Sequence, residues 1–153
     1  MDRGSGRPWD NTAGKHRAEL KQTVPLRTLL ADDSLEMLGR LEQWLGGHPG
    51  FNIIGKAYSG TDAVSQSRAL HPDLVVMDVT MPFMNGHEAT VRMKADVHRP
   101  AVILISFLDM CEAHTERGWK ADAFLRKDAL HEELLPTVAR LFPELRGFTE
   151  ARL

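Results

Sequence analysis

The sequence predicts an α/β domain in which a five-stranded parallel β-sheet lies between two layers of helices. The first observation behind this prediction is a set of five short apolar runs without polar alternation, as strands buried on both faces require. The second is that these runs alternate with segments of helical periodicity, which implies right-handed crossovers between parallel strands. The chain has 153 residues, and we expect one domain over residues 26–143.

The strands are predicted from short apolar runs, several of them rich in β-branched residues. In chain order these runs are LRTLLADD (26–33), FNIIGKAY (51–58), LVVMD (74–78), AVILISF (101–107) and AFLRK (123–127). The first run ends in two acidic residues and the third in one. These two strands are therefore expected to carry charge at their carboxyl ends.

Helices are predicted between and after the strands from their apolar spacing. They cover residues 34–47, 61–70, 87–95, 108–119 and 130–142. Ser34 is the expected N-cap of the first helix, which a glycine pair ends, and Thr61 is the expected cap of the second. Pro136 lies inside the last helix, where a proline disturbs the backbone hydrogen bonds.

Composition indicates an ordinary globular protein and argues against several other classes. The formal net charge is −2 and 42% of the residues are hydrophobic, so nothing indicates binding to nucleic acid or to a membrane. The single cysteine, Cys111, excludes an intrachain disulfide, and no apolar run approaches the roughly 18 residues of a membrane span. Residues 1–25 lack a secretory signal and are expected to be a disordered tail of a cytoplasmic protein. Residues 144–153 are expected to be a C-terminal tail or the start of a linker to an effector domain.

Polar residues at the strand ends form the candidate site. In a doubly wound sheet, ligands bind at the carboxyl ends of the strands, where we expect Asp32, Asp33, Asp78, Ser106 and Lys127 to meet. Three carboxylates at one edge repel each other, and a hard divalent cation such as Mg²⁺ relieves that repulsion. A cation alone does not need the lysine or the serine, whereas a phosphoryl group does. Because carboxylates can form acyl phosphates, Asp78 at the centre is a candidate nucleophile.

With these residues in place, the sequence resembles a known family, the receiver domains of two-component response regulators. The resemblance rests on an ordered set of motifs: DD after the first strand, MDVTMPFMNG around Asp78, a serine after AVILI, and ADAFLRKD in the last strand. It covers about residues 26–142. It implies a flavodoxin-like, doubly wound five-stranded parallel sheet of order 2-1-3-4-5 with five helices. It also implies a cytoplasmic signalling protein that is not itself an enzyme.

The resemblance further implies roles for the acidic residues. Asp78 is expected to accept a phosphoryl group from a sensor histidine kinase or a phosphotransfer protein, with Mg²⁺ as the cofactor. Asp32, Asp33 and Asp78 are expected to hold the metal, together with the backbone carbonyl of Thr80.

Ser106 and Lys127 are implied to hold the phosphoryl oxygens, and Ser106 also to act as a switch together with Phe124. The resulting change is expected to reach the surface formed by residues 108–119, the last strand and residues 130–142. This surface is a candidate homodimer interface, and no nucleic acid or membrane is expected as a partner of this chain.

Three residues depart from the family pattern. A small residue usually follows the switch hydroxyl, but here it is Phe107. Asp128 stands where proline commonly follows the lysine, and Lys120 where glycine usually precedes the AD pair. We expect Phe107 to act as a gate whose bulk hinders both the phosphoryl donor and the hydrolytic water, so that phosphorylation and self-dephosphorylation are both slow.

Two other functions compete with this hypothesis. A magnesium phosphohydrolase also uses a strand-end aspartate, but it typically carries a second aspartate two residues later, where this chain has Thr80. A receiver-like module that binds partners without taking phosphate is the other alternative, and it is supported only by Phe107. The leading hypothesis is a phosphoacceptor receiver domain.

Overall fold

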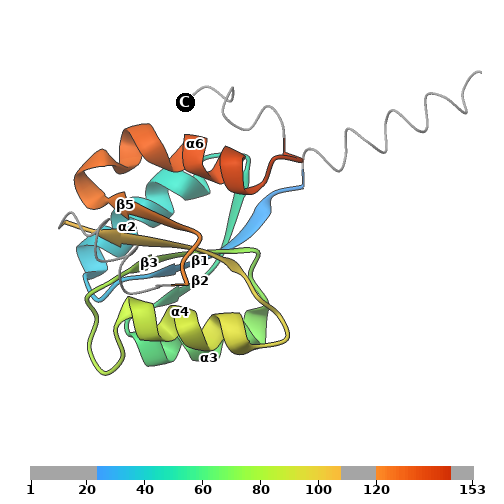
Figure 1. Cartoon of the computed structure of the whole chain (residues 1–153). Coiled ribbons are helices and arrows are strands. Elements are labelled where there is room, and N and C mark those ends of the chain that lie inside the picture. The colour runs from blue at the N-terminus through green and yellow to red at the C-terminus, as the bar shows by residue number, and fades with distance from the viewer. Residues whose placement is uncertain (1–23, 108–119, 146–153) are drawn as a thin grey trace, which may run out of the picture.

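A five-stranded parallel sheet with the strand order β2-β1-β3-β4-β5 forms the centre of the molecule (Figure 1). The computed structural model describes residues 24–107 and 120–145. The strands are β1 (Leu26–Ala31), β2 (Phe51–Ala57), β3 (Leu74–Asp78), β4 (Ala101–Ser106) and β5 (Ala123–Arg126). The predicted fold class and strand order are confirmed. Lys127 was expected to end the last strand, but β5 ends one residue earlier and Lys127 begins a short 3-10 helix, η1 (Lys127–Ala129).

Two layers of helices cover the sheet. The α-helices within the described residues are α2 (Leu35–Gly46), α3 (Gly60–Leu70), α4 (Gly86–Ala95) and α6 (Leu130–Leu141). In Figure 1, α2 and α6 lie on one face of the sheet, and α3 and α4 lie on the other. The helix predicted over residues 108–119 lies outside the described residues. Among the helices described, none has the length and apolar composition needed to span a bilayer.

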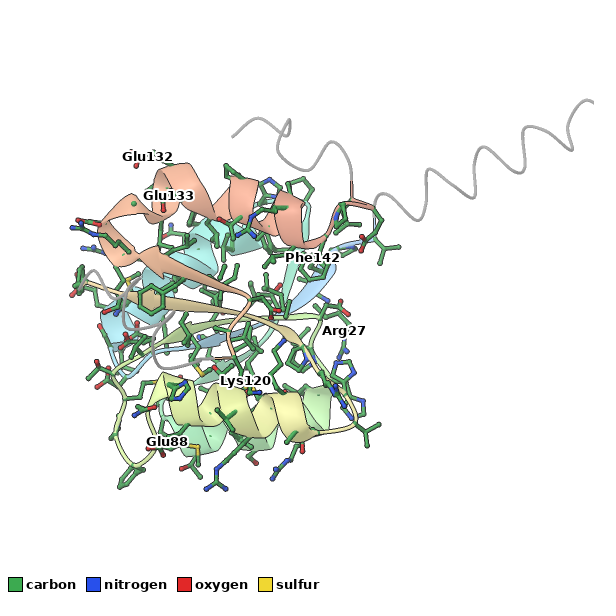
Figure 2. All side chains as sticks on the ribbon, viewed as in Figure 1. Arg27, Glu88, Lys120, Glu132, Glu133 and Phe142 are labelled. Carbon is green, nitrogen blue, oxygen red and sulfur yellow. The ribbon has the colours of Figure 1, made fainter. Side chains whose placement is uncertain are left out.

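The alternation of side chains along each strand divides the core into two clusters. Leu30 and Val76 pack with α2 and α6, whereas their chain neighbours Leu29 and Val75 pack with α3 and α4. All four side chains are fully buried. This is what continuous apolar strands produce when both faces of a sheet are covered. Figure 2 shows apolar side chains filling both layers, while charged ones such as Glu132 and Glu88 point outward.

Side-chain oxygens cap three of the helices. Ser34 accepts a hydrogen bond from the backbone N–H of Met37, which confirms it as the N-cap of α2. The expected cap Thr61 is wrong, because Ser59 accepts the bond from the N–H of Asp62 and α3 already begins at Gly60. A serine or threonine caps a helix only where its own backbone is extended, and periodicity alone does not locate that residue.

Loops at the carboxyl edge of the sheet pack closely against each other. A Cβ on Gly86 would overlap the carbonyl oxygen of Asp78, and one on Gly60 would overlap that of Met84. The N–H of Gly86 donates to the carbonyl of Val79 over 2.7 Å, which ties the start of α4 to the end of β3. These glycines therefore allow the loops after β2 and β3 to close around the edge where the candidate site lies.

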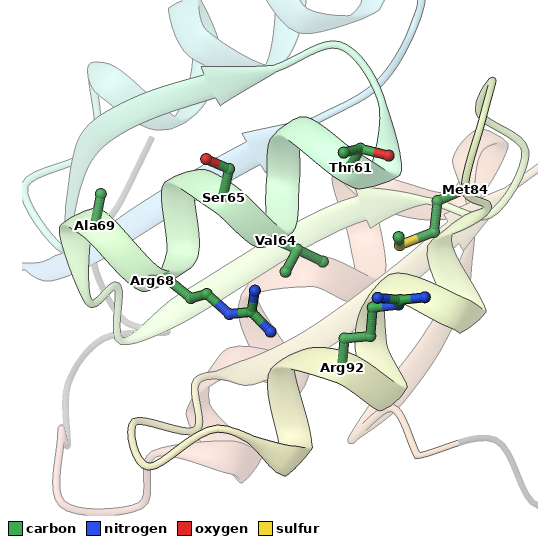
Figure 3. Close-up of a pocket in the computed structure, with 7 residues that line it drawn as sticks. All are labelled: Thr61, Val64, Ser65, Arg68, Ala69, Met84 and Arg92. Atoms are coloured by element: carbon green, nitrogen blue, oxygen red, sulfur yellow. The ribbon is translucent and has the colours of Figure 1, made fainter.

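A groove of about 440 Å³ lies between α3 and α4, beside Met84 in the loop after β3 (Figure 3). Val64 and Met84 contribute apolar surface to it, and Arg68 and Arg92 line it from the two helices. Arg68 is engaged by Asp96, whose Oδ2 accepts from its Nε over 3.0 Å. The residues that line this groove include no carboxylate, so it is separate from the acidic site described below.

Candidate functional site

Three carboxylates meet at the carboxyl edge of the sheet, as predicted. Because β1 pairs with β3, with Ala31 opposite Met77, the acids that follow these two residues are neighbours. One oxygen from each of Asp32, Asp33 and Asp78 lies within 4.8 Å of the others. Asp32 is fully buried and Asp78 nearly so, whereas Asp33 is exposed. The site is therefore closed at Asp32 and Asp78 and open to solvent at Asp33.

Local backbone bonds hold Asp32 in place. Its N–H donates to the carbonyl of Ala57 on β2, and its Oδ1 accepts from the N–H of Ser34 over 2.9 Å. Its Oδ2 lies 2.8 Å from Nζ of Lys127 in an ion pair, yet this oxygen has no well-aligned hydrogen bond in the described part of the chain. A buried carboxylate oxygen with that geometry retains capacity to bind a cation.

Lys127 reaches the acids from the far side of β4, at the start of η1 beyond β5. Its Nζ lies 2.8 Å from Asp32 and 3.5 Å from Oδ1 of Asp78, and its side chain is only 7% exposed. The ring of Phe107 stands against the same ammonium group, with 5.0 Å between the ring centroid and Nζ. The predicted convergence of Lys127 with Asp32 and Asp78 is thus present in the structure.

Asp78 holds its proton more tightly than an ordinary aspartate. Burial raises its pKa and the neighbouring charge of Asp32 raises it further, and the net pKa is about 6. The ammonium of Lys127 and a backbone hydrogen bond from Thr80 act in the opposite direction and lower the pKa. One lysine does not offset the repulsion between these acids, so the ionised carboxylate at Asp78 benefits from a further cation.

The residues present fit a hard divalent cation. They offer carboxylate oxygens from three residues, which is the donor type that Mg²⁺ and Ca²⁺ take. Asp32 has an oxygen without an aligned hydrogen bond, and exposed Asp33 leaves space on the solvent side for water ligands. Mg²⁺ usually binds to one or two protein carboxylates and keeps several waters, so this donor set suits it.

The remaining predicted residues lie at or near the same edge. Ser106 is buried at the end of β4, and its strand runs between β3 and β5. Thr80 is exposed, and its backbone N–H donates a hydrogen bond to the carboxylate of Asp78. Phe124, in β5, is half-buried and packs against the cluster beneath α3 and α4. Phe107 is 68% exposed and lies beside Lys127.

A family model for the response regulator receiver domain matches residues 28–139 of this chain. The chain belongs to the response regulator receiver family. The match lies within the predicted domain and confirms the resemblance seen in the sequence.

Curated relatives include proteins longer than the matched region. The protein-glutamate methylesterase/protein-glutamine glutaminase 4 of Myxococcus xanthus is 36% identical over 85 residues, which are 56% of this chain and 24% of that protein. The response regulator protein VraR of Staphylococcus saprophyticus is 24% identical over 78% of this chain and 57% of its own length. The chain spans about a quarter of the length of the first relative.

Solved receiver structures share the fold. The complex of CheX and CheY with beryllofluoride and magnesium from Borrelia burgdorferi contains a chain with 28% identity and a TM-score of 0.72. The alignment covers 80% of the present chain and 93% of that chain. The receiver assignment therefore rests on the family model and is supported by the three-dimensional fold.

Sequence reasoning missed the backbone contacts and caps that shape the loops around the site. Gly60 and Gly86 permit backbone contacts that any side chain would block, and Ser59 and Asn85 cap the helices that follow. The Ser-Gly and Asn-Gly pairs, each directly before a helix, carried the signal. The sequence marks these pairs as turns but does not show what they approach.

Proposed function

We propose that Asp78 is the phosphoacceptor of this receiver domain and takes a phosphoryl group from a sensor histidine kinase or a phosphotransfer protein. The observation that supports this most strongly is the position of Asp78, whose carboxylate lies 3.5 Å from Lys127 within a cluster of acids. In the transfer, an oxygen of Asp78 forms a bond to phosphorus while the bond from phosphorus to the donor's histidine nitrogen breaks, and the imidazole regains neutrality on release. The solved complex of CheX and CheY, which contains a chain similar to this one together with beryllofluoride and magnesium, supports the same chemistry here.

Each polar residue of the site has a part in this proposal. Asp32, Asp33 and Asp78, with the carbonyl of Thr80, would hold Mg²⁺. When bound, this ion would supply positive charge that neutralises the acids and the phosphoryl oxygens. Lys127, already placed beside Asp78, pairs with one phosphoryl oxygen.

The switch and its output belong to the same proposal. The hydroxyl of Ser106 donates a hydrogen bond to a phosphoryl oxygen, and Phe124 moves inward as Ser106 shifts. The surface around β5 and α6 then changes, and a second copy of the chain binds there. Residues 108–119, which were expected to contribute to that surface, lie outside the described residues.

Acetyl phosphate labelling followed by mass spectrometry tests the proposal. The wild-type protein should gain one phosphoryl group in Mg²⁺, and the gain should disappear in EDTA and in Asp78→Asn. Asp128→Asn is a matched control, because its carboxylate pairs with Arg126 on the surface. Labelling that persists in Asp78→Asn would reject the acceptor, and a wild type that takes no phosphoryl group would favour the phosphate-independent module.

The lifetime of the acyl phosphate is the second arm of this test. The gate assigned to Phe107 predicts a slow loss of the phosphoryl group and slow labelling. Phe107→Ala should then accelerate both rates. A decay rate in the variant equal to that of the wild type would remove the gate from the proposal without affecting Asp78.

A further inference from the structure

We propose that Phe107 is a positioning residue for Lys127, and that the face of its ring holds the ammonium group over the two buried carboxylates. The inference rests on the proposed function, because its effect on the reaction is measured as a change in the affinity for a phosphoryl analogue. Its starting point is a difference in exposure. The side chain of Lys127 is 7% exposed, while the aromatic residue beside it is 68% exposed.

The core gives no reason for a phenylalanine at this place. Phe107 belongs to neither buried cluster of the described residues, and most of its surface faces water. A large apolar side chain that stays mostly exposed contributes little hydrophobic stabilisation to the fold. The ammonium of Lys127 lies 5.0 Å from the ring centroid, which is within the range of a cation–π contact.

The surroundings of Lys127 explain what the ring contributes. An ammonium group has three N–H bonds, and burying it is costly unless each of them has a partner. Asp32 Oδ2 lies 2.8 Å and Asp78 Oδ1 3.5 Å from Nζ, so the two carboxylates are ion-pair partners on one side of the ammonium group. The ring of Phe107 occupies a further direction with its negative face and takes the place that water would otherwise hold.

The backbone places the ring on the side of the sheet that carries α2 and α6. Side chains alternate along β4, so that Ile105 packs toward α2 and α6 and Phe107, two residues later, points to the same side. There it lines a groove of about 310 Å³ together with Lys127 and Trp44. This groove gives a larger aromatic ring room at position 107 without displacing the lysine.

Positioning and gating by Phe107 have different signatures. A gate slows arrival and departure by the same factor and leaves the binding constant unchanged. A residue that holds Lys127 in place changes the binding constant, because a lysine that is free to move pairs less well with the phosphoryl oxygens. The two roles are therefore separated by equilibrium affinity and by substitutions that keep either bulk or aromatic character.

The experiment compares Phe107→Leu, which keeps bulk and removes the ring, with Phe107→Tyr, which keeps the ring. The probe is beryllofluoride with Mg²⁺, and its dissociation constant is measured by titration calorimetry. We expect the leucine variant to bind about three- to tenfold more weakly and the tyrosine variant to stay within about twofold of the wild type. Equal affinity of the leucine variant and the wild type would overturn the inference.

A second measurement reads the contact directly in the protein without metal or phosphoryl analogue. The ring current of Phe107 should shift the ε-methylene proton signals of Lys127 upfield, and this shift should vanish in Phe107→Leu and persist in Phe107→Tyr. Unchanged Lys127 signals in the leucine variant would also overturn the inference. A wild type that shows the ring-current shift but binds no beryllofluoride would instead reject the proposed function and, with it, the role of the contact in phosphoryl binding.

Discussion

At the scale of single residues, the site is defined by charges that a buried position makes costly. Asp78 lies beside fully buried Asp32, and burial together with that neighbour raises its pKa from 3.8 to about 6. Lys127 compensates part of this cost, but it is shared between the two acids. The acidic site is therefore a place where the fold keeps charged groups together at a cost in stability, as functional sites often do.

The raised pKa predicts how stability depends on pH in the absence of metal. Between pH 3.8 and about 6 the folded protein binds the Asp78 proton more tightly than the unfolded chain does. The contribution of the Asp78 carboxyl to the free energy of unfolding is therefore greatest at the acidic end of this window and falls as the pH rises through it. Asp78→Asn should be more stable than the wild type at pH 7.5 by about 1–3 kcal/mol. At pH 5 this difference in stability should be smaller.

Urea unfolding in EDTA at both pH values measures this difference. Asp128→Asn serves as the control, because an exposed ion pair contributes little and its removal should change stability only slightly. A wild type as stable as Asp78→Asn at pH 7.5 would show that the acids in the folded protein are not strained by their proximity.

At the scale of secondary-structure elements, two glycines illustrate opposite constraints. Gly39 lies on the exposed side of α2, and a Cβ there would meet nothing within 4 Å. Gly86 begins α4, where a Cβ would overlap the carbonyl of Asp78. Gly39 therefore lowers the stability of α2 although a side chain would fit there. Gly86, in contrast, allows α4 to start against the end of β3.

Alanine substitution separates these two cases. Gly39→Ala should stabilise the protein by about 0.5–1 kcal/mol, because alanine loses less backbone entropy in a helix. Gly86→Ala should destabilise it by about 1–3 kcal/mol and weaken Mg²⁺ binding, because the overlap displaces the backbone of Asp78. Chemical unfolding and a Mg²⁺ titration measure both effects. An unchanged Gly86→Ala protein would contradict the close packing of this loop.

At the scale of the whole molecule, the proposed metal binding would be linked to folding. The carboxylates of Asp33 and Asp78 come from segments more than forty residues apart, and the sheet brings them together only in the folded state. A cation that binds this arrangement and not the unfolded chain must stabilise the fold. At a Mg²⁺ concentration a hundred times the dissociation constant, the gain is about 2.7 kcal/mol.

Thermal unfolding with and without Mg²⁺ tests this linkage. The wild type should melt several degrees higher in excess Mg²⁺, and Asp33→Asn should lose most of this increase. Asp73→Asn is the control, because Asp73 lies at the other end of β3, where its Oδ2 accepts from the N–H of Arg27. The control should lose stability but keep the increase. An equal increase in Asp33→Asn would remove Asp33 from the metal site.

The elements and the site residues were predictable because their signals are local. Apolar runs without alternation located all five strands, and the acid pair after β1 and the acid at the end of β3 located the site. The errors were also local, since the cap of α3 is Ser59 and not Thr61, and β5 ends before Lys127. A cap depends on the backbone conformation of one residue, which hydrophobic spacing does not report.

The sequence alone determined the fold class, the family and the residues of the acidic edge, because chain order and hydrophobic spacing carry that information. Only the tertiary structure decided which groups touch. Lys127 sits closer to Asp32 than to Asp78, and the exposed ring of Phe107 lies against its ammonium. These contacts join Asp78 at the end of β3, Lys127 in η1 and the residues that directly follow β1 and β4, and they depend on strand pairing and register across the sheet. Pairing and register are set by long-range packing and hydrogen bonds, which no local pattern in the sequence specifies.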